Sequence, residues 1–127
     1  MASAILDASA LLAHIGGEPG ADGLDALAGE ALISAVNLAE VLAKLSERGL
    51  SQRDADGIVY RYRLEVIPFD EELARQTGAL RPATRSLGLS LGDRACLALA
   101  QRERLPVLTA DRSWAKLDLG VAIRVVR

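Results

Sequence analysis

The apolar positions of this chain form short continuous runs, separated by longer stretches in which apolar residues recur every three or four positions. The short runs predict buried strands, because continuous apolar segments of this length suit a sheet that is covered on both faces. We expect five strands, near residues 4–7, 31–36, 64–69, 106–109 and 121–126.

The stretches between these runs predict helices. The clearest begins at Asn37, where Leu38, Val41, Leu42 and Leu45 have the i, i+3, i+4, i+7 spacing of one apolar face. We expect further helices from residue 9 and over residues 22–29, 51–62, 70–80 and 90–102, with a break or kink at Pro82 and a loop over residues 85–88. The last of these helices has little polar surface, which predicts central burial. Strands that alternate with helices predict an α/β fold with a mostly parallel sheet between helical layers.

The composition is that of a globular protein. The chain has 127 residues, of which 50% are hydrophobic and 25% charged, and this length predicts one domain over residues 1–127. No apolar run reaches the roughly 18 residues of a membrane span, and no basic-then-apolar signal segment opens the chain, so we expect a cytoplasmic protein without membrane contact. Cys96 is the only cysteine, which excludes an internal disulfide and a cysteine-built zinc site.

The charge balance limits how the chain can bind nucleic acid. A net charge of −2 gives no global attraction to phosphate, and 3% aromatic residues cannot supply an extended stacking surface. Binding would therefore depend on local patches. Arg81, Arg85 and Arg94 flank one acidic motif and are candidates for phosphate contacts. A solvated arginine-rich loop explains the same three residues equally well.

Four carboxylates share one expected location. Asp7 and Asp111 lie just past the ends of predicted strands, while Glu40 and Asp93 lie in the first turns of predicted helices. In an open α/β sheet these places face the crevice beyond the carboxyl ends of the strands, where such folds bind ligands. The sequence therefore predicts that four separate segments bring carboxylates to one edge of the sheet.

Each of these acids also has a structural explanation on its own, as a helix cap or an ion-pair partner. The candidate interactions are a cap of the first helix by Asp7 or Ser9, Asn37 with Glu40, Glu40 with Lys44, Ser90 with Asp93, and Asp111 as the cap of the turn that carries Trp114. Taken together the acids favour a different interpretation, because like charges in one cleft repel unless a cation compensates them. An all-oxygen set suits Mg²⁺ or Mn²⁺. We therefore expect Asp7 to be a metal ligand and Ser9 to be the better cap.

Four segments of the sequence resemble the signature blocks of PIN domains, in order and at fitting spacing. These blocks are residues 5–11 (ILDASAL), 37–41 (NLAEV), 91–100 (LGDRACLALA) and 107–114 (VLTADRSW). The resemblance covers nearly the whole chain, and its length is similar to that of VapC-type toxins of type II toxin–antitoxin systems.

The resemblance implies a three-layer α/β/α fold with a mostly parallel sheet of about five strands, and a Mg²⁺- or Mn²⁺-dependent endoribonuclease. It assigns Asp7, Glu40 and Asp93 to the metal site, with Asp111 as a fourth and often more distant acid. Three further residues fall on positions that commonly support such a site by hydrogen bonding, namely Ser9, Asn37 and Thr109. The implied reaction is hydrolysis of RNA phosphodiester bonds.

The resemblance also implies partners. Toxins of this kind usually form homodimers and are neutralised by a cognate antitoxin protein. The apolar stripe of the early helices, with Leu11, Leu12, Val41 and Leu45, would suit such contacts, although stripes of this kind usually face the core.

Other functional classes remain open at this stage. A non-catalytic PIN-like module that binds RNA or protein would have the same fold without turnover, and a non-toxin housekeeping nuclease would have the same chemistry. A response-regulator receiver also places an aspartate after a strand. That class needs paired acids near its first strand and a lysine after a late strand, and neither is evident in the sequence.

Overall fold

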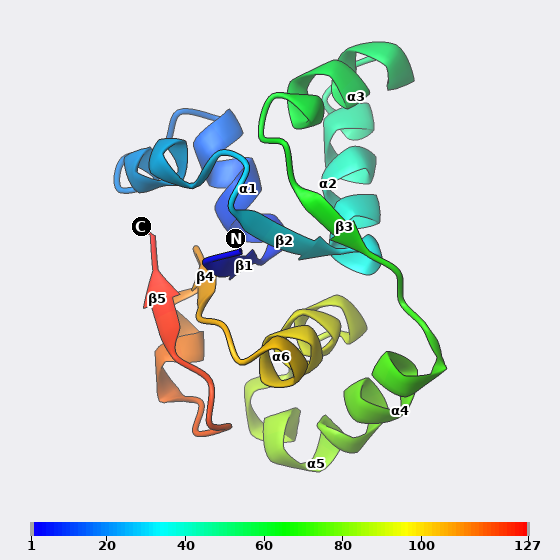
Figure 1. Cartoon of the computed structure of the whole chain (residues 1–127), viewed down its shortest axis with the longest axis vertical. Coiled ribbons are helices and arrows are strands. Elements are labelled where there is room, and N and C mark those ends of the chain that lie inside the picture. The colour runs from blue at the N-terminus through cyan, green and yellow to red at the C-terminus, as the bar shows by residue number, and fades with distance from the viewer. Residues whose placement is uncertain (1, 127) are drawn as a thin grey trace.

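The structure, a computed structural model, describes residues 2–126. Its centre is a sheet of five strands in the order β3-β2-β1-β4-β5 (Figure 1). Every neighbouring pair is parallel. The strands are β1 (Ala4–Leu6), β2 (Ala31–Ser34), β3 (Glu65–Ile67), β4 (Val107–Thr109) and β5 (Ile123–Val125). The prediction of an α/β fold with a parallel sheet is confirmed.

Helices cover both faces of this sheet, so the molecule has three layers. One face carries α1 (Ala8–Ile15), the 3₁₀ helix η1 (Asp22–Leu27), α2 (Ala35–Glu47) and α3 (Gln52–Tyr60). The other carries α4 (Glu71–Ala79), α5 (Arg81–Thr84), the 3₁₀ turn η2 (Arg85–Leu87) and α6 (Leu91–Glu103). Figure 1 shows the two groups on opposite sides of the strands. The 3₁₀ helix η3 (Arg112–Lys116) joins β4 to β5.

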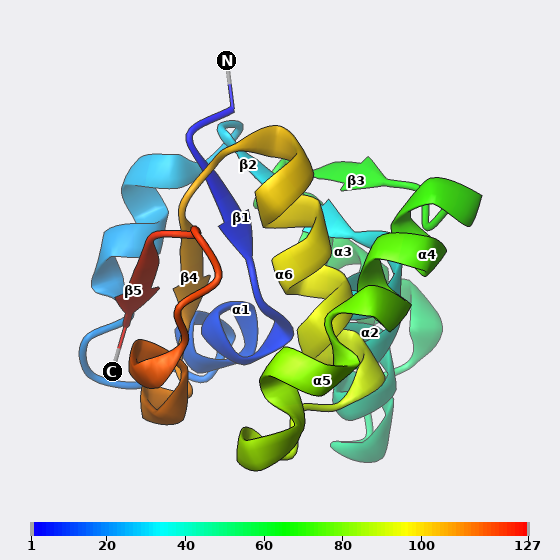
Figure 2. The ribbon, with the colours of Figure 1, turned by 90° about the horizontal axis from the view of Figure 1, so that it is seen from below.

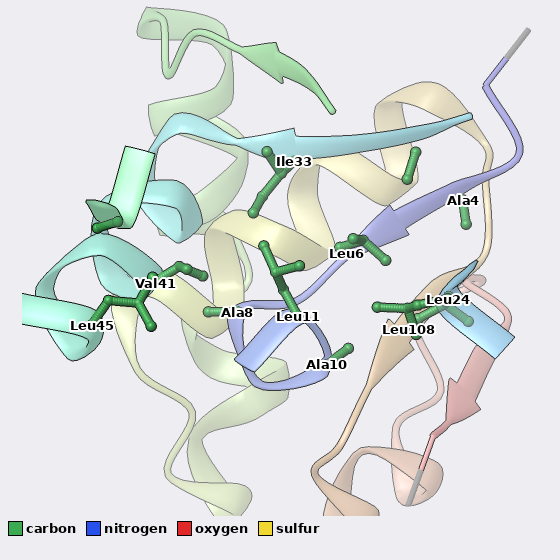
Figure 3. Packing of buried hydrophobic residues seen from close by; sticks show 12 residues of the cluster. Ala4, Leu6, Ala8, Ala10, Leu11, Leu24, Ile33, Val41, Leu45 and Leu108 are labelled. Atoms are coloured by element: carbon green, nitrogen blue, oxygen red, sulfur yellow. The ribbon is translucent and has the colours of Figure 1, made fainter. Parts of the chain in front are cut away.

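Successive side chains of each strand point into different layers. Leu6 and Ile33 pack with Leu11, Val41 and others beneath α1 and α2, as Figure 3 shows. Their strand neighbours pack on the opposite face with α4 and α6. The central strands β1, β2 and β4 are buried on both faces, so they contain consecutive buried residues instead of an alternating pattern. The edge strands β3 and β5 are only partly covered. The apolar stripe of the early helices is thus mainly core: Leu11, Val41 and Leu45 are buried.

The sixth helix is the most deeply buried helix of the fold. All residues from Ala95 to Ala100 are buried, and α6 contacts α4, α2 and the strands β1, β2 and β4. Cys96 is fully buried. The prediction of central burial for residues 90–102 is confirmed.

Three predicted elements differ in detail from the structure. The second strand ends at Ser34 and not near Val36, because the Ser34 hydroxyl accepts a hydrogen bond from the Val36 N–H and starts α2 there. The expected helix over residues 22–29 is the 3₁₀ helix η1, and the expected loop at residues 85–88 contains η2. The predicted break at Pro82 is confirmed, since α4 ends at Ala79 and Pro82 lies in the first turn of α5.

The strand ends fix where a site can form. In Figure 2, β1 and β4 point toward the end of the molecule at which α1 begins and to which the first turn of α6 also belongs. Within residues 2–126, no helix is long and apolar enough to cross a membrane.

Candidate active site

Asp7 lies at the junction between β1 and α1 and is only 4% exposed. Its Oδ2 accepts hydrogen bonds from the hydroxyls of Ser9, at 2.5 Å, and Thr109, at 3.0 Å. The Ser9 hydroxyl in turn accepts from the Ala110 N–H at 2.9 Å. Two hydroxyls therefore hold this carboxylate between β1 and β4.

The prediction that Ser9 caps the first helix is wrong, and so is the alternative that the Asp7 side chain caps it. Asp7 occupies the N-cap position of α1, but among residues 2–126 no side-chain cap hydrogen bond is made there. Ser9 lies inside the helix, and its hydroxyl contacts Asp7 and Ala110 instead. A buried carboxylate that does not cap its helix needs another explanation.

Glu40 is held by Asn37, one turn earlier on α2. The Asn37 Nδ2 donates to Glu40 Oε1 at 2.8 Å and to the Gly92 carbonyl oxygen at 3.0 Å. Asn37 is not the end of a strand or a helix cap, as its spacing from Glu40 had suggested, but a buried residue of the first turn of α2. The alternative ion pair with Lys44 is not formed, since Lys44 pairs with Glu47 at 3.2 Å.

Asp93 lies in the first turn of α6 and forms the predicted capping box with Ser90. The Ser90 N–H donates to Asp93 Oδ2 at 2.9 Å, and the Asp93 N–H donates to the Ser90 hydroxyl at 3.1 Å. The structural explanation of Asp93 is therefore correct, but it uses only one carboxylate oxygen.

Asp111 caps η3, as predicted for the turn that carries Trp114. Its Oδ1 accepts from the Ser113 N–H at 2.9 Å and the Ser113 hydroxyl at 2.7 Å. Thr109 supports the same turn, because its hydroxyl accepts from the Asp111 N–H at 3.1 Å. Asp111 is exposed, whereas Asp7 is buried.

The four acids share one arrangement of their oxygens. Among the described residues, the hydrogen bonds to each carboxylate fall on a single oxygen, Oδ2 of Asp7 and Asp93, Oε1 of Glu40 and Oδ1 of Asp111. Each acid is thereby oriented by the protein while its second oxygen remains available to a ligand.

Three of these acids lie close enough for their charges to interact, because Asp93 and Glu40 affect the pKa of Asp7. Burial raises the pKa of Asp7 from 3.8 to about 6, the Ser9 and Thr109 hydroxyls oppose that rise, and the negative charges of Asp93 and Glu40 add to it. The same three carboxylates also raise the pKa of the Cys96 thiol, which burial already holds well above its usual range. The charges of Glu40 and Asp93 therefore oppose the ionisation of both Asp7 and Cys96, whereas Asp111 is not among the charges that act on these two residues.

The donor set fits a hard divalent cation. All the candidate ligands are carboxylate oxygens, the type that Mg²⁺ and Mn²⁺ prefer, and a cation would offset the repulsion that raises the pKa of Asp7. Asn37 Oδ1 is buried without a hydrogen-bond partner among residues 2–126, which adds a polar atom beside Glu40. Within the same residues, no three acidic, histidine or cysteine side chains are already spaced to hold one ion.

The predicted phosphate-binding arginines differ in what they contact. Arg94 Nη1 donates to the Thr77 carbonyl oxygen at 3.1 Å, and Arg81 Nη1 donates to that of Leu89 at 3.5 Å, so both brace the α4–α6 side. Arg85 is exposed. Arg112, which the sequence analysis did not single out, lines a surface depression with Ser9, Ala110 and Asp111. Its position directly after Asp111 was the available signal.

The acids lie at the carboxyl ends of β1 and β4, in the first turn of α6 and in the second turn of α2, where Glu40 had been expected in the first turn. A parallel sheet with such acids defines a class of small α/β proteins with an acidic centre at the strand ends. A family model of the PIN domain matches residues 4–119. The chain therefore belongs to the PIN-domain family. No curated protein is similar enough in sequence to match.

Several solved structures with the same fold are described as toxin–antitoxin complexes or toxins. A chain of DNA-bound VapBC from Salmonella typhimurium is 21% identical, with a TM-score of 0.76 over 100% of both chains. A chain of a toxin–antitoxin complex from Klebsiella pneumoniae is 26% identical, with a TM-score of 0.72 over 94% of this chain and 96% of that one. Mycobacterium tuberculosis VapC20, described as a sarcin–ricin loop cleaving toxin, is 18% identical, with a TM-score of 0.71 over 91% and 97%.

Proposed function

We propose that this protein is a Mg²⁺- or Mn²⁺-dependent endoribonuclease. Asp7, Glu40 and Asp93 are the metal ligands, and Asp111 contributes a fourth, more exposed carboxylate. The observation that carries the proposal is the buried carboxylate of Asp7, whose pKa is raised first by burial and further by the charges of Asp93 and Glu40. A bound cation would compensate both effects.

The chemistry follows from how the chain orients these groups. A bound divalent ion would polarise the phosphoryl group and lower the pKa of an attacking water. Ser9 and Thr109 hold Asp7 through Oδ2, and Asn37 holds Glu40 through Oε1, so that the second oxygens remain for the metal. Fixing the ligands in this way lowers the reorganisation that the reaction requires.

The nuclease acts as the toxin of a toxin–antitoxin pair in this proposal. Membership in the PIN family and the likeness to chains crystallised as toxin–antitoxin complexes support it. The protein forms a homodimer and is neutralised by a cognate antitoxin, as the resemblance to VapC-type toxins implies. Expression of the chain alone is then expected to arrest growth, and co-expression of a small adjacent upstream reading frame to restore it. Growth arrest that no adjacent frame relieves would favour a housekeeping nuclease.

The nuclease activity itself is tested with purified, antitoxin-free protein and a structured RNA. Cleavage is expected with Mg²⁺ or Mn²⁺ and is expected to stop when a chelator is added. Full cleavage in chelator would refute the metal mechanism. Tight binding of metal and RNA without any cleavage would favour the non-catalytic module.

A further inference from the structure

Gly92 occupies a place in α6 where the helix itself does not need glycine. It lies in the first turn, one residue before Asp93, and is buried. Its φ is not among the positive values of this chain, so the backbone conformation is open to other residues. Because glycine is disfavoured in helices relative to alanine, its presence here calls for a local reason.

That reason is the side chain of Glu40. A Cβ atom at position 92 would lie 2.6 Å from Glu40 Cδ and closer still to both carboxylate oxygens. The other glycines within helices, Gly23, Gly57 and Gly78, have nothing within 4 Å of such a Cβ. Only at Gly92, among the described helical glycines, does the missing side chain make room for a functional carboxylate.

Asn37 also holds the Glu40 carboxylate next to Gly92. Its Nδ2 donates both to Glu40 Oε1 and to the carbonyl oxygen of Gly92. One amide thus fixes the carboxylate of α2 against the backbone of α6. The neighbouring residue on that backbone is Asp93, whose charge acts on Asp7 together with that of Glu40.

We propose that Gly92 is a positioning residue for the metal centre, because the absence of its side chain lets Glu40 lie against α6 beside Asp93. This inference rests on the proposed function. A Cβ at position 92 overlaps the end of a flexible side chain and not a backbone segment. The carboxylate therefore moves while the fold persists, and the loss falls on metal binding.

The first test compares Gly92→Ala with Gly78→Ala in the full-length chain. Mn²⁺ binding is measured by calorimetry, and thermal unfolding is measured in chelator. Gly92→Ala is expected to unfold within a few degrees of wild type and to bind Mn²⁺ at least about tenfold more weakly, whereas Gly78→Ala keeps wild-type affinity. Wild-type Mn²⁺ affinity in Gly92→Ala would overturn the inference.

A second readout needs no metal. Asn37 is the only asparagine of the chain, and the only other side-chain amides are Gln52, Gln76 and Gln101. Its NH₂ resonances are therefore assignable by NMR with an Asn37→Asp variant. In chelator, Gly92→Ala is expected to shift these resonances because Glu40 moves away from the Asn37 amide, whereas Gly78→Ala is expected to leave them unchanged. Unshifted Asn37 NH₂ resonances in Gly92→Ala would contradict the proposed role of Gly92 in positioning Glu40.

Rescue by a shorter acid separates positioning from general damage. Glu40→Asp withdraws the carboxylate by one methylene, so adding Gly92→Ala to Glu40→Asp is expected to weaken Mn²⁺ binding less than about threefold further. An equal loss of Mn²⁺ affinity in both backgrounds would overturn the inference.

If wild type binds Mn²⁺ and cleaves RNA but Gly92→Ala behaves identically, only the proposed role of Gly92 is wrong. If wild type does neither, the proposed function and this inference are both wrong.

Discussion

Asp7 is the residue whose environment conflicts most with its charge. Burial and two neighbouring carboxylates raise its pKa, and the hydroxyls of Ser9 and Thr109 only partly compensate. Such a group destabilises the metal-free protein at neutral pH. This is the pattern expected of residues placed for a ligand and not for the stability of the fold.

The raised pKa predicts how stability depends on pH. The folded protein binds the Asp7 proton more tightly than the unfolded chain does, so this stabilisation is complete below about pH 4 and is lost as the pH rises through about 6. A shift of about two units corresponds to about 3 kcal/mol.

Urea unfolding in chelator at pH 4 and pH 7.5 measures this loss. The free energy of unfolding of wild type is expected to fall by about 2.4 kcal/mol more than that of Asp7→Asn, which has no such proton, because Asp7 of the unfolded chain is already partly ionised at pH 4. Saturating Mn²⁺ is expected to remove most of the difference at pH 7.5. Parallel pH profiles for the two proteins would show that Asp7 is not electrostatically strained.

At the scale of elements, the first turn of α6 has both a structural and a functional task. Ser90 and Asp93 form a capping box, and the negative charge of Asp93 also raises the pKa of Asp7. The capping box uses only Oδ2 of Asp93, which accepts from the Ser90 N–H, and leaves Oδ1 for a ligand in the proposed function. Conservative substitutions can therefore separate the two tasks.

Asp93→Asn retains an oxygen that can accept from the Ser90 N–H, whereas Ser90→Ala removes the acceptor for the Asp93 N–H. We expect Asp93→Asn to reduce RNA cleavage at least about 100-fold with little loss of stability, because the ligand charge is lost and the cap is retained. Ser90→Ala is expected to lower the free energy of unfolding by about 1 kcal/mol. Urea unfolding and a cleavage assay on both variants check this. An Asp93→Asn protein that is unfolded, or fully active, would contradict it.

The elements also show how far the sequence could lead. Apolar runs such as Ala31–Ser34 predicted the buried strands, because local burial alone determines them. The start of α2 was misplaced because both Ser34 and Asn37 are good caps, and only the tertiary contact of Asn37 with Gly92 decides between them. The candidate acids were predicted from their positions after predicted strands and in the first turns of predicted helices. The contact of Glu40 with Gly92 could not be predicted, because these residues are 52 positions apart in the sequence and meet only in the folded structure.

At the scale of the whole molecule, the net charge of −2 gives no general attraction to RNA. In the proposed nuclease, RNA binding would depend on local cations. Two of the three predicted arginines are engaged with backbone carbonyls. Arg85, exposed on η2, is the one with a side chain free of such a bond among the described residues.

Arg85→Ala tests this surface in an Asp7→Asn background, where RNA is not consumed. We expect weaker binding of single-stranded RNA and a decrease of about 0.7 in the slope of log affinity against log salt, the value for one lost phosphate contact. Arg53→Ala, on the exposed side of α3, is the matched control. Fluorescence anisotropy across salt concentrations measures both. Equal slopes for the two variants would place the RNA elsewhere.

The central claim is that the buried Asp7 acts as a metal ligand in RNA cleavage. It is tested most directly by the cleavage rate of one RNA in saturating Mn²⁺, measured for wild type and Asp7→Asn after both are shown to be folded. We predict a loss of at least about 100-fold in the variant, because an amide cannot replace the ligand charge. An Asp7→Asn protein that cleaves RNA at the wild-type rate would contradict the claim.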